Sequence, residues 1–124
     1  MFKENSKAIY LQIVDRICDE VLGGVLKPDD RMPSVREYAA TVQVNPNTMM
    51  RAYDHLSSLG IIYNRRGIGF FVSAEAPEEI RKMRVRDMFG DRLLEVFREL
   101  QLLGITPEIL KERYEEYLGS NSTK

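Results

Sequence analysis

The segment NPNTMMR, residues 45–51, carries side chains of the types that read the edges of DNA bases. If the segment starts a helix, four of its side chains should face outward: Asn47, Thr48, Met50 and Arg51. Asparagine pairs with adenine, arginine with guanine and a hydroxyl with either base, while an apolar side chain can contact the methyl group of thymine. At the start of a helix that enters the major groove, this set could recognise a base sequence.

Two further clusters could contact the remainder of a DNA duplex. Ser34 and Arg36 stand at the expected start of the preceding helix, where free N–H groups and the helix dipole favour a phosphate. Arg65, Arg66 and Gly67 lie at the expected tip of a β-hairpin, and a narrow basic tip can enter a minor groove. The predicted DNA-binding residues are Ser34, Arg36, Asn45, Asn47, Thr48, Met50, Arg51, Arg65, Arg66 and Gly67.

Two helices should precede the segment that reads bases. Apolar residues recur at spacings of three and four over residues 8–22, which predicts an amphipathic helix that ends at Gly23-Gly24. A loop with two prolines follows. The sequence Ser34-Val35-Arg36-Glu37 then fits a capping box, in which the serine and glutamate side chains each accept from the other residue's backbone N–H. A short second helix should run from there to about Thr41.

A third helix and a hairpin complete the expected N-terminal domain, residues 1–75. Asn45 is a favourable N-cap and Pro46 suits the first helical position, so this helix should begin there and extend to Leu59. Two β-prone runs, 61–64 and 70–73, flank a basic centre that contains glycine and predict a hairpin. Helix, helix, tight turn, helix and hairpin is the order of a winged helix-turn-helix.

The expected C-terminal region, residues 76–124, is helical throughout. We predict a long helix over residues 78–103 with Gly90 as its weak point, then a last helix capped by Thr106, and a frayed GSNSTK tail. The apolar stripes of these helices lack enough partner surface within one chain, so burial of about 1,000 Å² against a second copy is the expected remedy. The alternative is a monomer whose long helix packs on its own winged helix. The predicted dimerisation residues are Val85, Phe89, Leu93, Val96, Leu100, Leu103, Leu110 and Tyr114.

Composition and single residues argue against several other classes of protein. The formal net charge is −1, so total charge neither favours nor excludes nucleic acid. No run of about 18 apolar residues exists and the N-terminus lacks a signal peptide's apolar core, which predicts a cytoplasmic protein without membrane contact. The lone Cys18 and the lone His55 have no partners at metal-binding or catalytic spacing. We expect no enzyme, metal or cofactor, with Cys18 buried and His55 on a helix surface.

A set of short motifs runs through residues 8–73: Met32-Pro33-Ser34-Val35-Arg36-Glu37, Asn47-Thr48, Arg51-Ala52, Leu56, Gly60 and Gly69-Phe70-Phe71-Val72. With these motifs, the segment resembles the DNA-binding domain of the GntR family of bacterial transcriptional regulators. The variant NPNT with RAY, together with Ile9-Tyr10 and Gln12-Ile13, is similar to the YtrA subfamily. The resemblance implies a homodimeric regulator of this kind, and the subfamily commonly represses operons for membrane transporters.

Several alternatives stay open at this point. Winged helices also serve as protein-interaction modules, and such a module would show no salt-dependent binding to a DNA duplex. The two C-terminal helices cannot readily enclose a metabolite pocket of several hundred Å³. Whether a small-molecule effector exists is left open, and one could still occupy a subunit junction. The base sequence is also open, because Met50 occupies a position that is often polar in the family.

Overall fold

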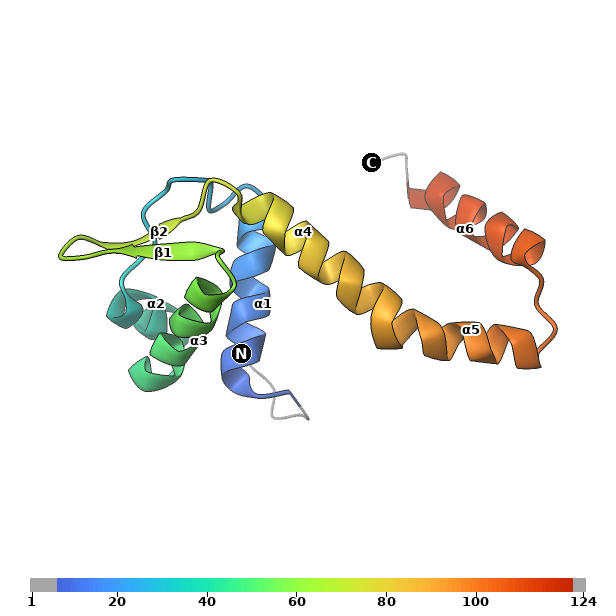
Figure 1. Ribbon diagram of the computed structural model, residues 1–124, viewed down its shortest axis with the longest axis horizontal. Coiled ribbons are helices and arrows are strands. Elements are labelled where there is room, and N and C mark those ends of the chain that lie inside the picture. Colours follow the sequence, from blue (N-terminus) through green and yellow to red (C-terminus); the bar gives the residue numbers. More distant parts are fainter. Residues whose placement is uncertain (1–6, 122–124) are drawn as a thin grey trace. The chain divides into compact units, whose positions relative to one another are not determined.

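The computed structural model of the protein describes residues 7–121, and the chain divides into two compact units at residues 83/84. Helices dominate both units, and one antiparallel hairpin lies in the first, which confirms the predicted fold class (Figure 1). None of the described helices combines the length and apolar character needed to cross a membrane. The elements are α1 (Ile9–Leu22), α2 (Val35–Val42), α3 (Pro46–Ser58), β1 (Ile62–Arg65), β2 (Gly69–Val72), α4 (Ala76–Asp87), the π-helical turn η1 (Met88–Arg92), α5 (Leu93–Leu102) and α6 (Pro107–Asn121).

The helix starts obey the predicted capping chemistry. The Ser34 N–H donates to Glu37 Oε1 at 2.9 Å, and the Glu37 N–H donates to Ser34 Oγ at 3.1 Å. Asn45 Oδ1 accepts from the Asn47 N–H at 2.7 Å, with Pro46 in the first turn of α3. Between these helices Gln43 adopts a left-handed conformation, with φ of 59°, and ends α2. Local sequence therefore fixes where α2 and α3 begin.

The first unit has a closed apolar core to which α1, α2, α3, the start of α4 and both strands contribute. Cys18 is fully buried in it, as predicted. The core includes Ala76 and Ile80, so the start of α4 packs with the winged helix. The buried members are Ile13, Val14, Ile17, Cys18, Val21, Met32, Tyr38, Ala39, Val42, Met49, Ala52, Tyr53, Leu56, Ile61, Ile62, Val72, Ala76 and Ile80.

A polar contact joins α1 to α2 at the edge of this core. The Tyr38 hydroxyl donates to the Glu20 carboxylate and accepts from Arg16 Nε at 3.2 Å. Burial, assisted by the Glu20 carboxylate, raises the pKa of Tyr38 to about 12. Tyr38 therefore remains a neutral hydrogen-bond donor at physiological pH and helps to hold α2 on α1.

The wing, which consists of β1, β2 and the turn between them, makes more backbone hydrogen bonds than the sequence predicted. The strands β1 and β2 pair in register from Ile62 opposite Val72 to Arg65 opposite Gly69. The preceding loop also pairs with β2, because the Met32 N–H donates to the Phe70 carbonyl at 2.8 Å. The prolines and aspartates of this loop carry no strand signal, which explains why the extra pairing could not be anticipated.

The C-terminal helices differ from the prediction in two places. The expected long helix over residues 78–103 is helical from Ala76 to Leu102, but the π-helical turn η1 replaces regular α-helix around Gly90, the predicted weak point. Gly90 lies inside this π-helical turn, where its low helix propensity weakens the regular α-helical pattern by about 1 kcal/mol relative to alanine. The expected fraying from Gly119 is wrong, since α6 continues to Asn121, whose side chain donates to the Tyr117 carbonyl at 2.9 Å. The rest of the predicted tail lies outside the described residues.

Candidate nucleic-acid and subunit interfaces

The predicted DNA-binding residues lie on three neighbouring elements of the first unit. They occupy the start of α2, the start of α3 and the turn between β1 and β2. The hairpin projects from the unit on the side where α2 and α3 lie (Figure 1). All ten residues are exposed except Thr48, which is half-buried. The arrangement leaves these side chains accessible to a large ligand.

The helix α3 has an outer strip of chemically distinct side chains. Asn47, Met50, Arg51 and Asp54 are exposed along this strip at spacings of three and four residues. The opposite strip of α3 is buried in the core. The amide, thioether and guanidinium groups therefore face outward together, as the sequence predicted, with one carboxylate at the far end of the strip.

The start of α2 offers backbone donors for an anion. The capping box uses the N–H groups of Ser34 and Glu37. The N–H groups of Val35 and Arg36 cannot be satisfied within the helix. These two donors, the helix dipole and the exposed Arg36 side chain suit a phosphate oxygen. The hydrogen bonds from the Ser34 backbone and side chain hold the pKa of Glu37 below its usual value.

An aromatic ring from another helix supports the outer strip of α3. The Arg51 guanidinium lies over the Tyr10 ring of α1, with Cζ 4.1 Å from the ring centroid. The same ring meets His55 edge-on, at 5.9 Å between centroids and an interplanar angle of 75°. His55 is therefore half-buried rather than fully on the surface. The sequence singled out Tyr10 only for its resemblance to the YtrA subfamily and gave no sign of this contact.

The wing tip is braced by Arg31, a residue that the sequence did not single out. Arg31 donates from Nη2 to the Ile68 carbonyl at 2.7 Å. Gly69 has φ of 138°, a conformation that other residues adopt only with strain, and a Cβ added there would lie 3.3 Å from Arg31 Nε. The Arg65 guanidinium lies 5.2 Å from the Phe71 ring centroid. Arg65 is thus supported by its own hairpin, whereas the adjacent turn is held from the loop before α2.

Tyr53 links all three elements of the candidate DNA-binding surface. Its ring is buried under α3, and its hydroxyl donates to the Pro33 carbonyl, next to the start of α2, at 2.7 Å. The ring also meets Phe70 of β2 edge-on, with 5.2 Å between centroids. Burial raises the pKa of Tyr53, so the hydroxyl keeps its proton and its hydrogen bond. One side chain thereby fixes α3 relative to α2 and to the wing.

The C-terminal unit presents a different kind of surface. Among the described residues of η1, α5 and α6, none is buried. Phe89 is 60% exposed, Leu103 70% and Tyr114 61%. The other predicted dimerisation residues are exposed or half-buried: Val85, Leu93, Val96, Leu100 and Leu110. So much exposed apolar side chain within 38 residues is unusual for a free surface.

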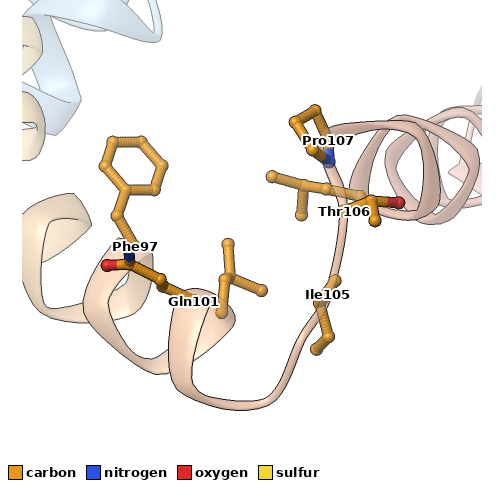
Figure 2. A pocket seen from close by; sticks show the side chains of 7 residues that line it. Phe97, Gln101, Ile105, Thr106 and Pro107 are labelled. Carbon is orange, nitrogen blue, oxygen red and sulfur yellow. The ribbon is translucent and has the colours of Figure 1, made fainter.

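A hollow of about 390 Å³ lies where α5 turns into α6. Figure 2 shows Phe97 of α5 on one side of the hollow and Pro107 of α6 on the other, with Ile105 in the connecting segment. Thr106 Oγ1 accepts from the Ile109 N–H at 3.3 Å and caps α6, as predicted. The lining is largely apolar and includes two of the predicted dimerisation residues, Leu100 and Leu110.

Comparison with known sequences identifies one family. Residues 9–72 match the family described as bacterial regulatory proteins, gntR family. The HTH-type transcriptional regulator YhcF of Bacillus subtilis is 40% identical over 112 residues, which cover 88% of this chain and 88% of the relative. The HTH-type transcriptional repressor YtrA of Bacillus subtilis is 34% identical over 112 residues, which cover 90% of this chain and 85% of the relative.

Solved structures show the same likeness. A transcriptional regulator of the GntR family from Bacteroides thetaiotaomicron matches with a TM-score of 0.83 and 44% identity, covering 91% of this chain and 98% of that chain. The structure of AraR(DBD) in complex with operator ORX1 matches with a TM-score of 0.53 and 28% identity, covering 58% of this chain and 87% of that chain. The first likeness extends over both units, and the second covers a DNA-binding domain.

Proposed function

Because this chain belongs to the gntR family of bacterial regulatory proteins, and within it to the YtrA subfamily, we propose that it represses transcription by binding an inverted-repeat operator as a homodimer. Family membership makes it a DNA-binding transcriptional regulator rather than an enzyme. The observation that carries the finer proposal is the outer strip of α3, where Asn47, Met50 and Arg51 are exposed together. Tyr53 holds this strip in a fixed relation to α2 and the wing.

Each part of the candidate DNA-binding surface has a distinct proposed role. The start of α3 enters the major groove, where its amide, hydroxyl and guanidinium groups meet base edges. Ser34 and Arg36, with the free N–H groups of α2, bind a phosphate. Arg65 and Arg66 reach into the adjacent minor groove. The operator complex of AraR(DBD) supports duplex DNA as the partner, because its domain resembles this one.

The proposed homodimer rests on the apolar surface of the C-terminal unit. A stable contact buries on the order of 1,000 Å² or more, and a second copy supplies such a surface with matching chemistry. In this proposal residues 1–75 bind DNA and residues 76–124 dimerise, although the start of α4 packs with the winged helix. A two-fold dimer places two recognition helices in successive major grooves, roughly 34 Å apart, which requires an inverted repeat.

A named relative supports the proposal that this chain is a repressor. YtrA of Bacillus subtilis is named a transcriptional repressor, and a bound dimer of the present chain would block transcription from an overlapping site. The subfamily resemblance extends the proposal to operons for membrane transporters, and to a protein that acts in the cytoplasm. Mapping genomic fragments that the protein retains would test this extension, since the fragments should lie upstream of transporter genes.

The DNA-binding proposal can be tested with duplexes selected from random DNA by the intact protein. Titrations at several salt concentrations should show that Arg51→Ala and Asn47→Ala each weaken binding to the selected duplex by about 1–3 kcal/mol. Arg65→Ala should instead weaken binding to all duplexes and flatten the salt dependence. Equal effects of all three variants on random DNA would contradict these roles. Absence of any salt-dependent duplex binding would favour a protein-interaction module.

A further inference from the structure

We infer that Tyr10, which lies in α1 outside the helix-turn-helix, is a positioning residue that sets base discrimination by Arg51. The inference rests on the proposed function, because it assigns Arg51 to the DNA-binding surface. Its basis is the contact between the Arg51 guanidinium and the Tyr10 ring, at 4.1 Å from Cζ to the centroid. That distance lies well inside the range of about 6 Å in which a cation is attracted to an aromatic face.

The Tyr10 ring is itself held in place. It is half-buried and packs against the apolar core of the first unit. The His55 ring, one turn after Arg51 along α3, contacts it edge-on. A ring fixed by the core and by a neighbouring ring is a rigid support, in contrast to an aromatic side chain free in solvent. The position of α1 on α3 therefore determines where the guanidinium rests.

This contact leaves the donors of Arg51 available. The five N–H groups of a guanidinium lie in its plane, so a ring against one face does not consume them. Within residues 7–121, no hydrogen bond or ion pair joins Arg51 to another side chain or to the backbone. The side chain is exposed on the outer strip of α3. Two of its in-plane donors can therefore bind a guanine edge while one face of the guanidinium stays against the Tyr10 ring.

Support from Tyr10 should improve both affinity and discrimination. An unsupported arginine samples many rotamers and loses this freedom when it binds, whereas a stacked arginine has lost part of it beforehand. An exposed cation–π contact corresponds to about a two- to fivefold change in an equilibrium constant. Since a misplaced guanidinium can meet other acceptors, loss of the ring should also reduce the preference for the correct base.

The test compares Tyr10→Leu with Tyr10→Phe in the intact protein. The probe is the duplex selected by the wild-type protein, together with single-base variants at the pair where Arg51→Met relaxes discrimination. Tyr10→Leu should weaken binding to the selected duplex about two- to fivefold and reduce discrimination at that pair only. Tyr10→Phe, which keeps the aromatic face, should behave as wild type. In an Arg51→Met background, Tyr10→Leu should have no further effect.

Other outcomes would overturn the inference. Unchanged affinity and discrimination in Tyr10→Leu would do so, as would the same loss with and without Arg51, which would indicate general destabilisation. Thermal unfolding of each variant identifies folding defects. If Tyr10→Leu does not fold, the side-chain ¹⁵N spectrum of the wild-type protein decides, because a stacked Arg51 should give an Nε–H proton signal shifted by the ring. An unshifted signal would overturn the inference. Wild-type protein that selects no duplex would defeat the proposed function, and the inference with it.

Discussion

The two compact units bury their apolar side chains to very different extents. In the first unit, three helices, both strands and the start of α4 contribute to one closed core. In the second, none of the described side chains of η1, α5 and α6 is buried, although α5 is as amphipathic as α1. An amphipathic pattern predicts that the apolar face of a helix will be covered, but it does not indicate which surface covers it. The first unit covers its own faces, and the second requires an external surface.

The largest expected effect comes from a charge on the apolar face of the second unit. Val96→Asp should give a monomer, and operator affinity should fall by about 10²- to 10⁴-fold, because two linked binding modules gain that factor over one. Sedimentation and duplex titration measure the two results. Val25→Asp, at an exposed valine of the first unit, should leave both unchanged. Wild-type mass and affinity in Val96→Asp would contradict the proposed subunit contact.

The next largest difference between the two units should appear when a leucine side chain is truncated in each. Leu56→Ala removes a fully buried side chain of α3 and should lower the free energy of unfolding by about 2–5 kcal/mol. Leu102→Ala, at a leucine that is 86% exposed in α5, should change it by no more than about 0.5 kcal/mol. Denaturant unfolding measures both variants. Similar losses at the two positions would mean that the second unit buries Leu102 in solution.

Loss of a single hydrogen bond should give a smaller effect. Tyr53→Phe removes the donor to the Pro33 carbonyl and should lower the free energy of unfolding by about 1–3 kcal/mol. The matched change Tyr117→Phe, at an exposed tyrosine of α6, should leave it unchanged. Equal unfolding curves for wild type and Tyr53→Phe would show that the hydroxyl does not hold α3 to the start of α2.

The smallest expected effect concerns the capping box at the start of α2. The pKa of Glu37 is lowered from its usual 4.5, so its ionised form is favoured in the folded state. Its contribution to stability is fully present above pH 4.5 and is lost as the pH falls through the lowered pKa. Glu37→Gln keeps an acceptor for the Ser34 N–H but cannot titrate. The slope of unfolding free energy against pH in this acid range should therefore be shallower in Glu37→Gln, and identical slopes would refute the coupling.

Features with a local cause could be predicted from the sequence. The capping box at Ser34, the Asn45 cap with Pro46, and the hairpin with its basic tip all depend on neighbouring residues, and the structure contains them. The exposed strip of α3 followed from the period of the helix. The bounds of these elements differ from the predicted ones by a residue or two, as expected where helix and strand ends have weak signals.

Features with a distant cause could not be predicted. Arg31 and Ile68 are 37 residues apart, and nothing in either neighbourhood indicates their hydrogen bond. The contact of Tyr10 with Arg51 likewise depends on how α1 packs against α3. The π-helical turn η1 has no sequence signature beyond Gly90, which was expected only to weaken an unbroken helix. Support for Arg51 and for the hairpin turn thus came from packing that no local pattern encodes.

The most direct test of the whole account is the native mass of the intact protein with and without its selected duplex. We expect two copies in the free protein and two copies on one duplex that contains an inverted repeat, since each copy supplies one recognition helix. One copy in the free protein, or one copy per duplex at saturation, would contradict the central claim that the second unit is completed by another copy of this chain.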